Sequence, residues 1–493
     1  MNIDNRTHRI CHLFILYFLV LMLAAITSAG EAADQNTNDT ACVSPGEGYT
    51  LLGKIKPRHA RNIESSNWSV GAETMDRDFT IYKNWRKYLG PLGVKKARIQ
   101  AGWAKTEKQP GKYDWAWLDE IIPDMVDQGV EPWVCLCYGN PIYPGGGGTG
   151  LGGGIPTSEE ALAAWDRFVA AFVQRYKNQV DEWEVWNEPS LQGINSSKTY
   201  ADLLIRTAEI IRKQQPDARV IGFAMAGIKL TWMDEVLKQV QQKGKLNLID
   251  EVSYHPYKYN PDQSYPAVEE LRDLVKSYSK QLILRQGENG TPSQRGSFGA
   301  LSKHNWTERG QAKWALRRLL GDLARGIPSS YFAICDMEYP SRRNYKGLLA
   351  INDDKTVNHK KTAYGAVQNL TAIFDDNLQR MPMLDPKVVA RKGIKFFAAA
   401  YSSKDAKPLL TIWRGNDIPD VKPEVQRLSL TLENVKFNEP VWIDLLSGRV
   451  FAINDSIWET TSKGTTFKSL PVYDSPVVIC DRGVISESLV EQK

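Results

Sequence analysis

The chain has 493 residues, which is long enough for one large domain or for two. It is 42% hydrophobic, 10% aromatic and 24% charged, a composition that supplies a core and excludes a disordered, fibrous or low-complexity protein. The net charge is only +5 and no basic block occurs, so the sequence predicts no nucleic-acid partner. The 15 Trp residues are a first indication of sugar binding, because Trp stacks on flat apolar faces, although most single Trp side chains serve packing.

The N-terminus has the order of a secretory signal peptide. Two Arg residues precede the apolar run Leu13–Ile26, and the small-residue stretch Thr27–Gly30 follows it. Residues 1–30 are therefore predicted to be a signal peptide and residues 31–60 a flexible leader. We expect a secreted or periplasmic protein with no stable membrane insertion after cleavage, and an uncleaved N-terminal anchor is the alternative.

The cysteines define neither a disulfide scaffold nor a metal site. Cys11 would leave with the signal peptide, and the five that remain are an odd number without metal-ligand spacing. Cys135 and Cys137 would share one face of a strand, which favours core packing. A Cys42–Cys480 disulfide is compatible with an oxidising compartment, but the spacing gives it no support. We predict no metal and no organic cofactor.

From Trp68 to Phe374, short β-like runs alternate with helical patterns, which is typical of a parallel α/β fold. The predicted strands are Trp68–Glu73, Val94–Trp103, Glu131–Tyr138, Val180–Asn187, Arg219–Gly227, Ile249–Tyr257, Gln281–Glu288 and Ser329–Asp336. The predicted helices are Trp117–Gln128, Glu159–Lys177, Tyr200–Gln214, Trp232–Lys243, Pro266–Tyr278, Gln311–Arg325 and Lys361–Phe374.

Eight βα units within residues 61–375 match a (β/α)8 TIM barrel, which takes about 250 residues before insertions. A doubly wound open sheet is the alternative. It is disfavoured because no Gly-x-Gly-x-x-Gly turn follows the first strand. The Gly-rich run Gly145–Gly154 follows the third strand and lacks the Lys-Ser/Thr of a phosphate-binding loop, so it is either a flexible loop at the barrel mouth or a plain linker.

Residues 376–493 show short alternating runs separated by turn residues, a pattern that predicts a small antiparallel β-sandwich packed on the barrel. The predicted strands are Lys395–Tyr401, Pro408–Trp413, Gln426–Leu432, Val441–Leu445 and Val477–Cys480. No catalytic motif occurs in this region, so the chemistry is expected in the barrel.

Two carboxylates end predicted barrel strands. The fourth strand ends in Trp186-Asn187-Glu188-Pro189, and the seventh ends in Gln-Gly-Glu288. A TIM barrel builds its active site at the carboxyl ends of its strands, and a carboxylate there costs desolvation energy that packing does not return. Glycosidic bond cleavage needs such a pair, one as acid and one as nucleophile or base.

With these motifs the sequence resembles the retaining glycoside hydrolases of clan A, whose fourth strand ends in Asn-Glu-Pro and whose seventh ends in a nucleophilic Glu. The resemblance implies that Glu188 is the general acid/base, that Glu288 is the nucleophile and that Asn187 holds the sugar 2-hydroxyl. It also implies that Arg98 on the second strand supports the nucleophile. The substrate would be an oligosaccharide or polysaccharide, and double displacement would be the mechanism.

Other residues lie where this group of enzymes binds its substrate. His255 and Tyr257 end the sixth strand and resemble the His and Tyr that many clan members place beside the nucleophile. Glu73, at the end of the first strand, is a candidate for binding a sugar hydroxyl, and Glu338 is a weaker one. Aromatic residues that end or follow strands are candidates for stacking on sugar faces or for packing: Trp103, Tyr138, Trp186, Trp306 and Tyr339.

Within the clan, the segment Pro110–Trp115, the Trp-Asn-Glu-Pro motif and the trailing β domain are most similar to family 39, which is largely made up of exo-acting β-xylosidases and related glycosidases. Family 5 endo-glycanases are the nearest rival. Family 39 members commonly carry Thr or Ser before the nucleophile, where this chain has Gly287. The remaining alternatives are an inactive sugar-binding protein on the same scaffold and an extracellular structural protein, and the intact pair of glutamates argues against both. The sequence leaves the oligomeric state open.

Overall fold

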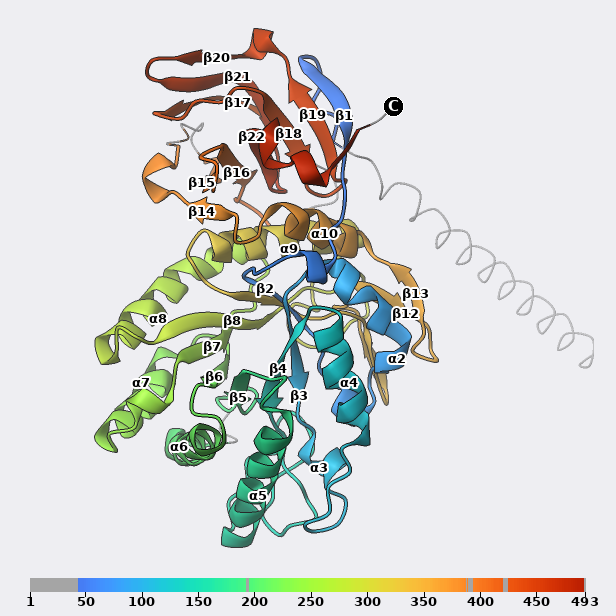
Figure 1. Ribbon diagram of the computed structural model, residues 1–493, viewed down its shortest axis with the longest axis vertical. Helices are drawn as coiled ribbons and strands as arrows, with labels where there is room; N and C mark the ends of the chain where they lie inside the picture. The colour runs from blue at the N-terminus through green and yellow to red at the C-terminus, as the bar shows by residue number, and fades with distance from the viewer. Residues whose placement is uncertain (1–42, 192–194, 387, 389–392, 420–423, 492–493) are drawn as a thin grey trace, which may run out of the picture. The chain divides into compact units, whose positions relative to one another are not determined.

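The fold is described by a computed structural model of the chain (Figure 1), which covers residues 43–191, 195–386, 388, 393–419 and 424–491. The predicted signal peptide, Cys11, Cys42 and most of the predicted leader lie outside the described residues. Within the described ranges, no helix combines the length and the apolarity that spanning a membrane requires.

Eight parallel strands close into a barrel, because the eighth strand pairs with the first. The strands are β2 (Trp68–Gly71), β3 (Lys96–Gln100), β4 (Glu131–Leu136), β5 (Glu182–Val185), β6 (Arg219–Ala226), β7 (Glu251–His255), β8 (Ile283–Asn289) and β9 (Ser329–Tyr331). Each lies within or beside its predicted run, since a strand buried on both faces shows as an apolar run in the sequence. The predicted TIM barrel is confirmed.

Helices follow the strands and lie outside them (Figure 1). Helix α5 shows why they form: Ser158 caps its first turn by accepting a hydrogen bond from the Ala161 amide, and the face that carries Phe168 and Phe172 is buried. The first βα unit departs from the pattern, because only the short helix α2 and 3₁₀ turns stand between β2 and β3. The helices are α2 (Tyr82–Trp85), α3 (Trp103–Thr106), α4 (Ala116–Asp127), α5 (Glu159–Tyr176), α6 (Ser197–Gln214), α7 (Leu230–Gln242), α8 (Tyr265–Tyr278), α9 (Glu308–Leu323) and α10 (Thr362–Ile373).

The segment between β9 and α10 contains two short hairpins. The first consists of β10 (Met337–Tyr339) and β11 (Arg342–Asn344), and the second of β12 (Leu349–Ile351) and β13 (Val357–Lys360). Both hairpins follow β9, so this segment begins at the carboxyl end of the barrel. Residues 345–348 join the two hairpins.

The C-terminal region forms two antiparallel sheets, as predicted. An eight-stranded sheet has the order β14-β15-β16-β22-β18-β19-β1-β23, and a three-stranded sheet has the order β17-β21-β20. The strands are β14 (Leu378–Arg380), β15 (Phe396–Ser403), β16 (Pro408–Arg414), β17 (Gln426–Glu433), β18 (Pro440–Asp444), β19 (Arg449–Ile453), β20 (Trp458–Thr461), β21 (Gly464–Val472), β22 (Val477–Asp481) and β23 (Leu489–Glu491).

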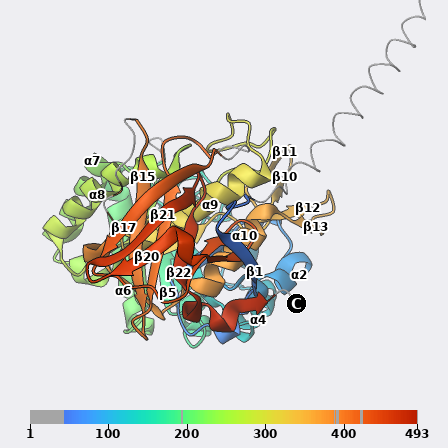
Figure 2. The same ribbon diagram turned by 90° about the horizontal axis from the view of Figure 1, so that it is seen from above.

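Strand β1 (Tyr49–Ile55) differs from the predicted flexible leader of residues 31–60. It pairs with β19 on one side and with β23 on the other, so a segment from before the barrel completes the C-terminal sheet (Figures 1 and 2). Its partners lie at the far end of the chain, and a local pattern in the sequence does not reveal such pairing.

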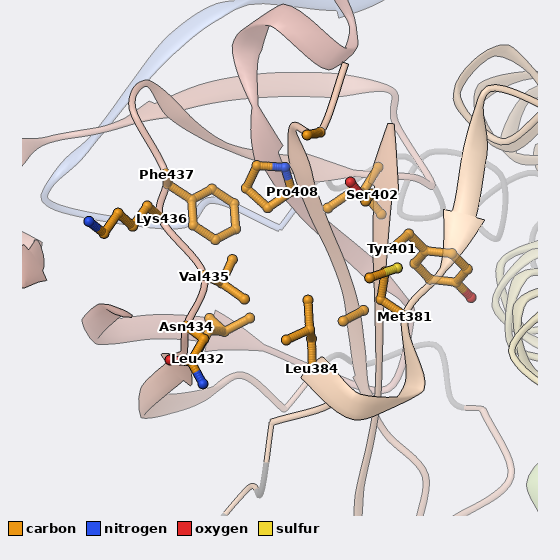
Figure 3. Close-up of a pocket in the computed structure, with 13 residues that line it drawn as sticks. Met381, Leu384, Tyr401, Ser402, Pro408, Leu432, Asn434, Val435, Lys436 and Phe437 are labelled. Atoms are coloured by element: carbon orange, nitrogen blue, oxygen red, sulfur yellow. The ribbon is translucent and has the colours of Figure 1, made fainter. Parts of the chain in front are cut away.

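A pocket of about 130 Å³ lies in this C-terminal region. Figure 3 shows Leu384, Val435 and Phe437 at its walls, and Lys436 pointing away from it. No carboxylate or histidine is among its lining residues, so it lacks the groups found at the barrel mouth.

Arg317 of α9 joins the barrel to the C-terminal domain. Its guanidinium is buried, donates to Asp262 Oδ2 at 2.5 Å and to Asn260 Oδ1 at 2.8 Å, and reaches the carbonyl of Asp417 at 2.9 Å. The Trp413 indole donates to the same Asp262 oxygen at 3.1 Å. The ion pair therefore ties both domains to one buried carboxylate.

Arg317→Met is expected to lower the free energy of unfolding by about 3–5 kcal/mol, because it leaves the Asp262 charge without its partner in a mostly buried place. The control is Arg206→Met. It breaks an ion pair with Asp166 whose side chains are 42% and 32% exposed, and should cost less than about 1 kcal/mol. Thermal denaturation of both variants measures the difference, and similar losses in the two would contradict this role of Arg317.

Candidate active site

Glu188 and Glu288 meet at the carboxyl ends of β5 and β8. Each side chain is 12% exposed. One oxygen of each carboxylate and a ring nitrogen of His255 all lie within 4.8 Å of one another. Retaining glycosidases hold their two carboxyl groups about 5–5.5 Å apart and inverting enzymes about 6.5–9.5 Å apart, so the spacing fits retention.

Arg98 of β3 lies beneath this pair and is fully buried. It donates to Glu184 Oε2 at 2.7 Å, to Glu73 Oε1 at 3.0 Å and to Glu288 Oε2 at 3.2 Å. Burial alone would lower the pKa of Arg98, but the negative groups around it, Glu184 first, raise that pKa well above its ordinary value. Arg98 is therefore a permanent cation that fixes one oxygen of Glu288.

The other oxygen of Glu288 is held by Tyr257. The Tyr257 hydroxyl donates to Glu288 Oε1 at 2.7 Å. Burial raises the pKa of Tyr257 well above its ordinary value, and the charge of Glu288 adds to the rise, so the hydroxyl keeps its proton. Glu288 thus accepts two hydrogen bonds from groups that do not give up their protons, as suits an ionised carboxylate.

Glu188 faces a different environment, the imidazole of His255. His255 Nδ1 lies 3.0 Å from Glu188 Oε1 and 3.8 Å from Glu288 Oε2, and the ring is fully buried. Burial would lower the pKa of His255, but the charges of Glu288 and Glu188 outweigh it and raise that pKa. Glu188 therefore shares a hydrogen bond with a group that can itself hold or give a proton.

Asn187 connects the two glutamates to the wall of the site. Its Oδ1 accepts from Arg98 at 2.8 Å, and its Nδ2 donates to the Tyr138 hydroxyl at 2.7 Å. The ring of Tyr138 packs edge-on against Trp186, and the guanidinium of Arg77 lies 4.9 Å from its centroid. The amide of Asn187 is thus oriented by the protein before any substrate binds.

Two predicted substrate-binding residues lie away from the open site. The Glu73 side chain is 1% exposed and is bound by Arg98, so it supports the site from below and is not placed to bind a sugar hydroxyl. Trp103 is fully buried against Trp165 and donates to Glu107 at 2.6 Å, which places it in the core between the strands and α5. The sequence located both beside strand ends but gave no indication of the direction of their side chains.

The weaker aromatic and acidic candidates differ among themselves. Trp186 and Trp306 are each 3% exposed and pack against other rings, whereas Tyr339 is partly exposed beside Phe79. Glu338 forms an ion pair with Arg343. Of the three aromatic residues, Tyr339 alone has a partly exposed ring, so it remains a candidate for stacking on a sugar.

Two residues of the site were not singled out from the sequence. Glu184 lies on β5, whose four residues are all buried, and it pairs with Arg98. A charged residue inside an apolar strand could have identified it from the sequence. The other is Ser253 of β7, which explains why Gly287 precedes the predicted nucleophile: a Cβ at that position would collide with the Ser253 hydroxyl and approach His255 Nε2 to 3.3 Å. Ser253 thus leaves no space for the Thr or Ser side chain that is common in family 39.

Glu73→Gln is expected to remove a pH dependence of stability. Burial raises the pKa of Glu73 from 4.5 to about 7, against the effect of Arg98 and with a contribution from Glu288. Because the folded-state pKa is raised, protonation of Glu73 stabilises the fold fully below pH 4.5, and this contribution is lost as the pH rises through about 7. Thermal midpoints at about pH 5 and about pH 8 should show that the stability of the wild type falls with pH relative to that of the variant. A constant difference between the two proteins would contradict the raised pKa.

Comparison with known proteins gives a family match over part of the barrel. Residues 92–286 match the model of "Glycosyl hydrolases family 39", a range that includes Arg98, Glu188 and His255 and ends just before Glu288. No curated protein sequence matches the chain.

Solved structures of family 39 enzymes share the fold. A family 39 glycoside hydrolase from the gut symbiont Bacteroides cellulosilyticus WH2 is 18% identical with a TM-score of 0.59, and the match covers 84% of this chain and 81% of that one. A monomeric β-xylosidase from Caulobacter crescentus CB15 is 18% identical with a TM-score of 0.57, and the match covers 87% and 97%. The family 39 enzyme from Xanthomonas axonopodis pv. citri is 18% identical with a TM-score of 0.57, and the match covers 87% and 95%. These structures show that the chain shares their architecture. The family model shows in addition that part of the barrel is similar in sequence. Residues 92–286 of the barrel are thus similar in sequence to the glycosyl hydrolases of family 39, and this similarity indicates a glycosidase.

Proposed function

We propose that the protein is an exported, exo-acting β-glycosidase of the β-xylosidase type that works by double displacement. The observation that carries this proposal is the unequal environment of two neighbouring glutamates. Glu288 accepts hydrogen bonds from Arg98 and Tyr257, and Glu188 shares one with His255. An ionised nucleophile and a proton-carrying acid are the two states that a retaining glycosidase requires.

In the first step, Glu188 in its acid form gives its proton to the glycosidic oxygen while a Glu288 oxygen attacks the anomeric carbon. The bond to the leaving group breaks, and a covalent glycosyl-enzyme forms. In the second step, Glu188 takes a proton from water, the water oxygen attacks the anomeric carbon, and Glu288 leaves. His255 is placed to orient Glu188 in both steps. Asn187, fixed by Arg98 and Tyr138, is placed to bind the sugar 2-hydroxyl.

The choice of an exo-acting β-xylosidase rests on the comparisons. The solved structures similar to this chain include two of a β-xylosidase from Caulobacter crescentus, and their likeness extends over the C-terminal domain because it covers 86–87% of this chain. Export rests on the signal-like order of residues 1–30.

The test is hydrolysis of a panel of 4-nitrophenyl β-glycosides and soluble polysaccharides by the purified protein. The xyloside should be cleaved faster than the polysaccharides, and proton NMR of the first product should show the β-anomer. First release of the α-anomer would overturn double displacement. Faster cleavage of internal polysaccharide bonds would overturn exo action in favour of an endo-glycanase. Recovery of a chain that begins beyond residue 30 from the medium or periplasm of the producing cells would support export, whereas full-length protein in the cytoplasm would contradict it.

A further inference from the structure

A pocket of about 220 Å³ lies on the C-terminal domain and shares no lining residue with the pocket in Figure 3. Every residue that lines it lies outside the barrel, on or beside β1, β18, β19, β20 and β22. The pairing of β1 with β19 shifts between Leu51 and Gly53, so Leu52 has no partner on β19, and it lines the pocket. The pocket is therefore a feature of the C-terminal domain alone.

Trp458, the first residue of β20, lines this pocket and differs from the other two Trp residues of the C-terminal domain. Trp413 and Trp442 are fully buried, and each packs against another aromatic ring. Their indoles donate to Asp262 Oδ2 at 3.1 Å and to the Pro471 carbonyl at 3.0 Å. Trp458 is partly exposed, and within the described ranges its ring pairs with no other ring and its Nε1 has no acceptor. Core packing thus explains the first two Trp residues but not Trp458.

Three polar side chains line the pocket together with Trp458, and they are those of Asn438, Glu439 and Asp455. All three residues are exposed, and none of these side chains forms a hydrogen bond or an ion pair with another described residue. The backbone that carries two of them is fixed, because the amides of Asn438 and Glu439 donate to Asp481 Oδ1 at 2.8 Å and 3.2 Å. The pocket thus combines an indole ring with polar groups that the protein itself does not use.

A sugar ring matches this combination of groups. It has an apolar face of C–H groups that stacks on an indole ring, and its hydroxyls donate to carboxylates and amides. A mainly apolar wall with a few converging polar groups is the usual composition of a small-molecule site. The two carboxylates outnumber the single guanidinium of Arg482, so the lining carries an excess of negative charge and disfavours an anionic glycan.

We propose that this pocket is a second carbohydrate-binding site, at which Trp458 stacks on one unit of a neutral glycan chain and Glu439 and Asp455 accept hydrogen bonds from its hydroxyls. The volume is below the range of about 300–1,000 Å³ for pockets that enclose a drug-sized ligand, so the site receives a single sugar unit. Binding here requires neither Glu188 nor Glu288, so the proposal goes beyond the proposed catalytic function. Such a site keeps the protein on a polysaccharide between catalytic events.

The test measures the binding of soluble glycans to purified protein that carries Glu288→Gln, so that no probe is hydrolysed during the measurement. Affinity gel electrophoresis and calorimetry with xylan, mixed-linkage β-glucan, β-galactan and the anionic polygalacturonate give the dissociation constants. At least one neutral glycan should bind, and adding Trp458→Ala should weaken its binding about tenfold or more, because the stacking surface is lost. Adding Asp455→Ala should weaken it about two- to tenfold, the range of one hydrogen bond.

The control is Glu459→Gln, which changes the neighbour of Trp458 on β20 without changing a lining residue, and it should bind as the Glu288→Gln parent does. Asp455 is exposed, so Asp455→Ala tests the pocket also where Trp458→Ala lowers the thermal midpoint. Equal affinity of the parent and both pocket variants would place glycan binding in the barrel and overturn the proposal. Absence of binding to every neutral probe, or a preference for polygalacturonate, would overturn it as well.

Discussion

Glu288→Gln is expected to abolish hydrolysis of every glycoside, with a fall in kcat of about 10⁴-fold or more, since the amide cannot attack the anomeric carbon. The loss should be equally severe for activated aryl glycosides, because their leaving groups need no acid but still need a nucleophile. The substitution keeps the shape of the side chain, and the Tyr257 hydroxyl can donate to the amide oxygen as it does to Glu288 Oε1. Steady-state hydrolysis of 4-nitrophenyl β-D-xyloside measures the effect.

Stability has to be followed beside activity in this variant, because Arg98 loses one of the three carboxyl groups that it contacts. Glu184 remains to compensate the guanidinium, so the thermal midpoint should change little. A folded variant that retained more than about one hundredth of the wild-type kcat would exclude Glu288 as the nucleophile.

Glu188→Gln should have an effect that depends on the leaving group. A general acid contributes about 10²–10⁴-fold, and it is needed when the departing oxygen is a poor leaving group. Disaccharides and alkyl glycosides should therefore lose most of their rate, while 4-nitrophenyl and 2,4-dinitrophenyl glycosides keep part of theirs through the first step. His255 Nδ1 stays 3.0 Å from the substituted side chain and can donate to its amide oxygen, so the local structure should survive.

A plot of log kcat/KM against leaving-group pKa shows this difference as a slope. The slope should be shallow for the wild type and steep for Glu188→Gln. Parallel slopes in the two proteins would argue against Glu188 as the acid, and His255 would then be the nearest alternative proton donor.

The sequence located the barrel because short β-like runs alternate with helical patterns along it. Glu188 and Glu288 were found because each ends such a run, where packing does not explain a carboxylate. The sequence shows that a residue follows a strand but not where its side chain points. Trp103 and Glu73 were therefore predicted to lie at the open site, whereas both are buried. Glu73 and Glu184 gain their role from Arg98, and a guanidinium that reaches three carboxylates on three strands is a property of the closed barrel.

Ser253 left no signal in the sequence, since its importance comes from the space that it occupies beside Gly287 on the next strand. Contact between neighbouring strands decides its role, and the spacing within one strand does not contain that information.

The position of strand β1 affects when the C-terminal sheet can form during synthesis. Because β1 precedes the barrel and its partners β19 and β23 follow it, the barrel is an insertion into the C-terminal domain, and the first and the last described strands lie in one sheet. During synthesis, β1 is made first and must wait for nearly the whole chain before it can pair. A fragment of residues 376–493 would expose the edges of β19 and β23 that β1 covers, and bare strand edges are templates for aggregation. The boundary between the domains is therefore crossed twice by the chain, and a single cut does not separate them.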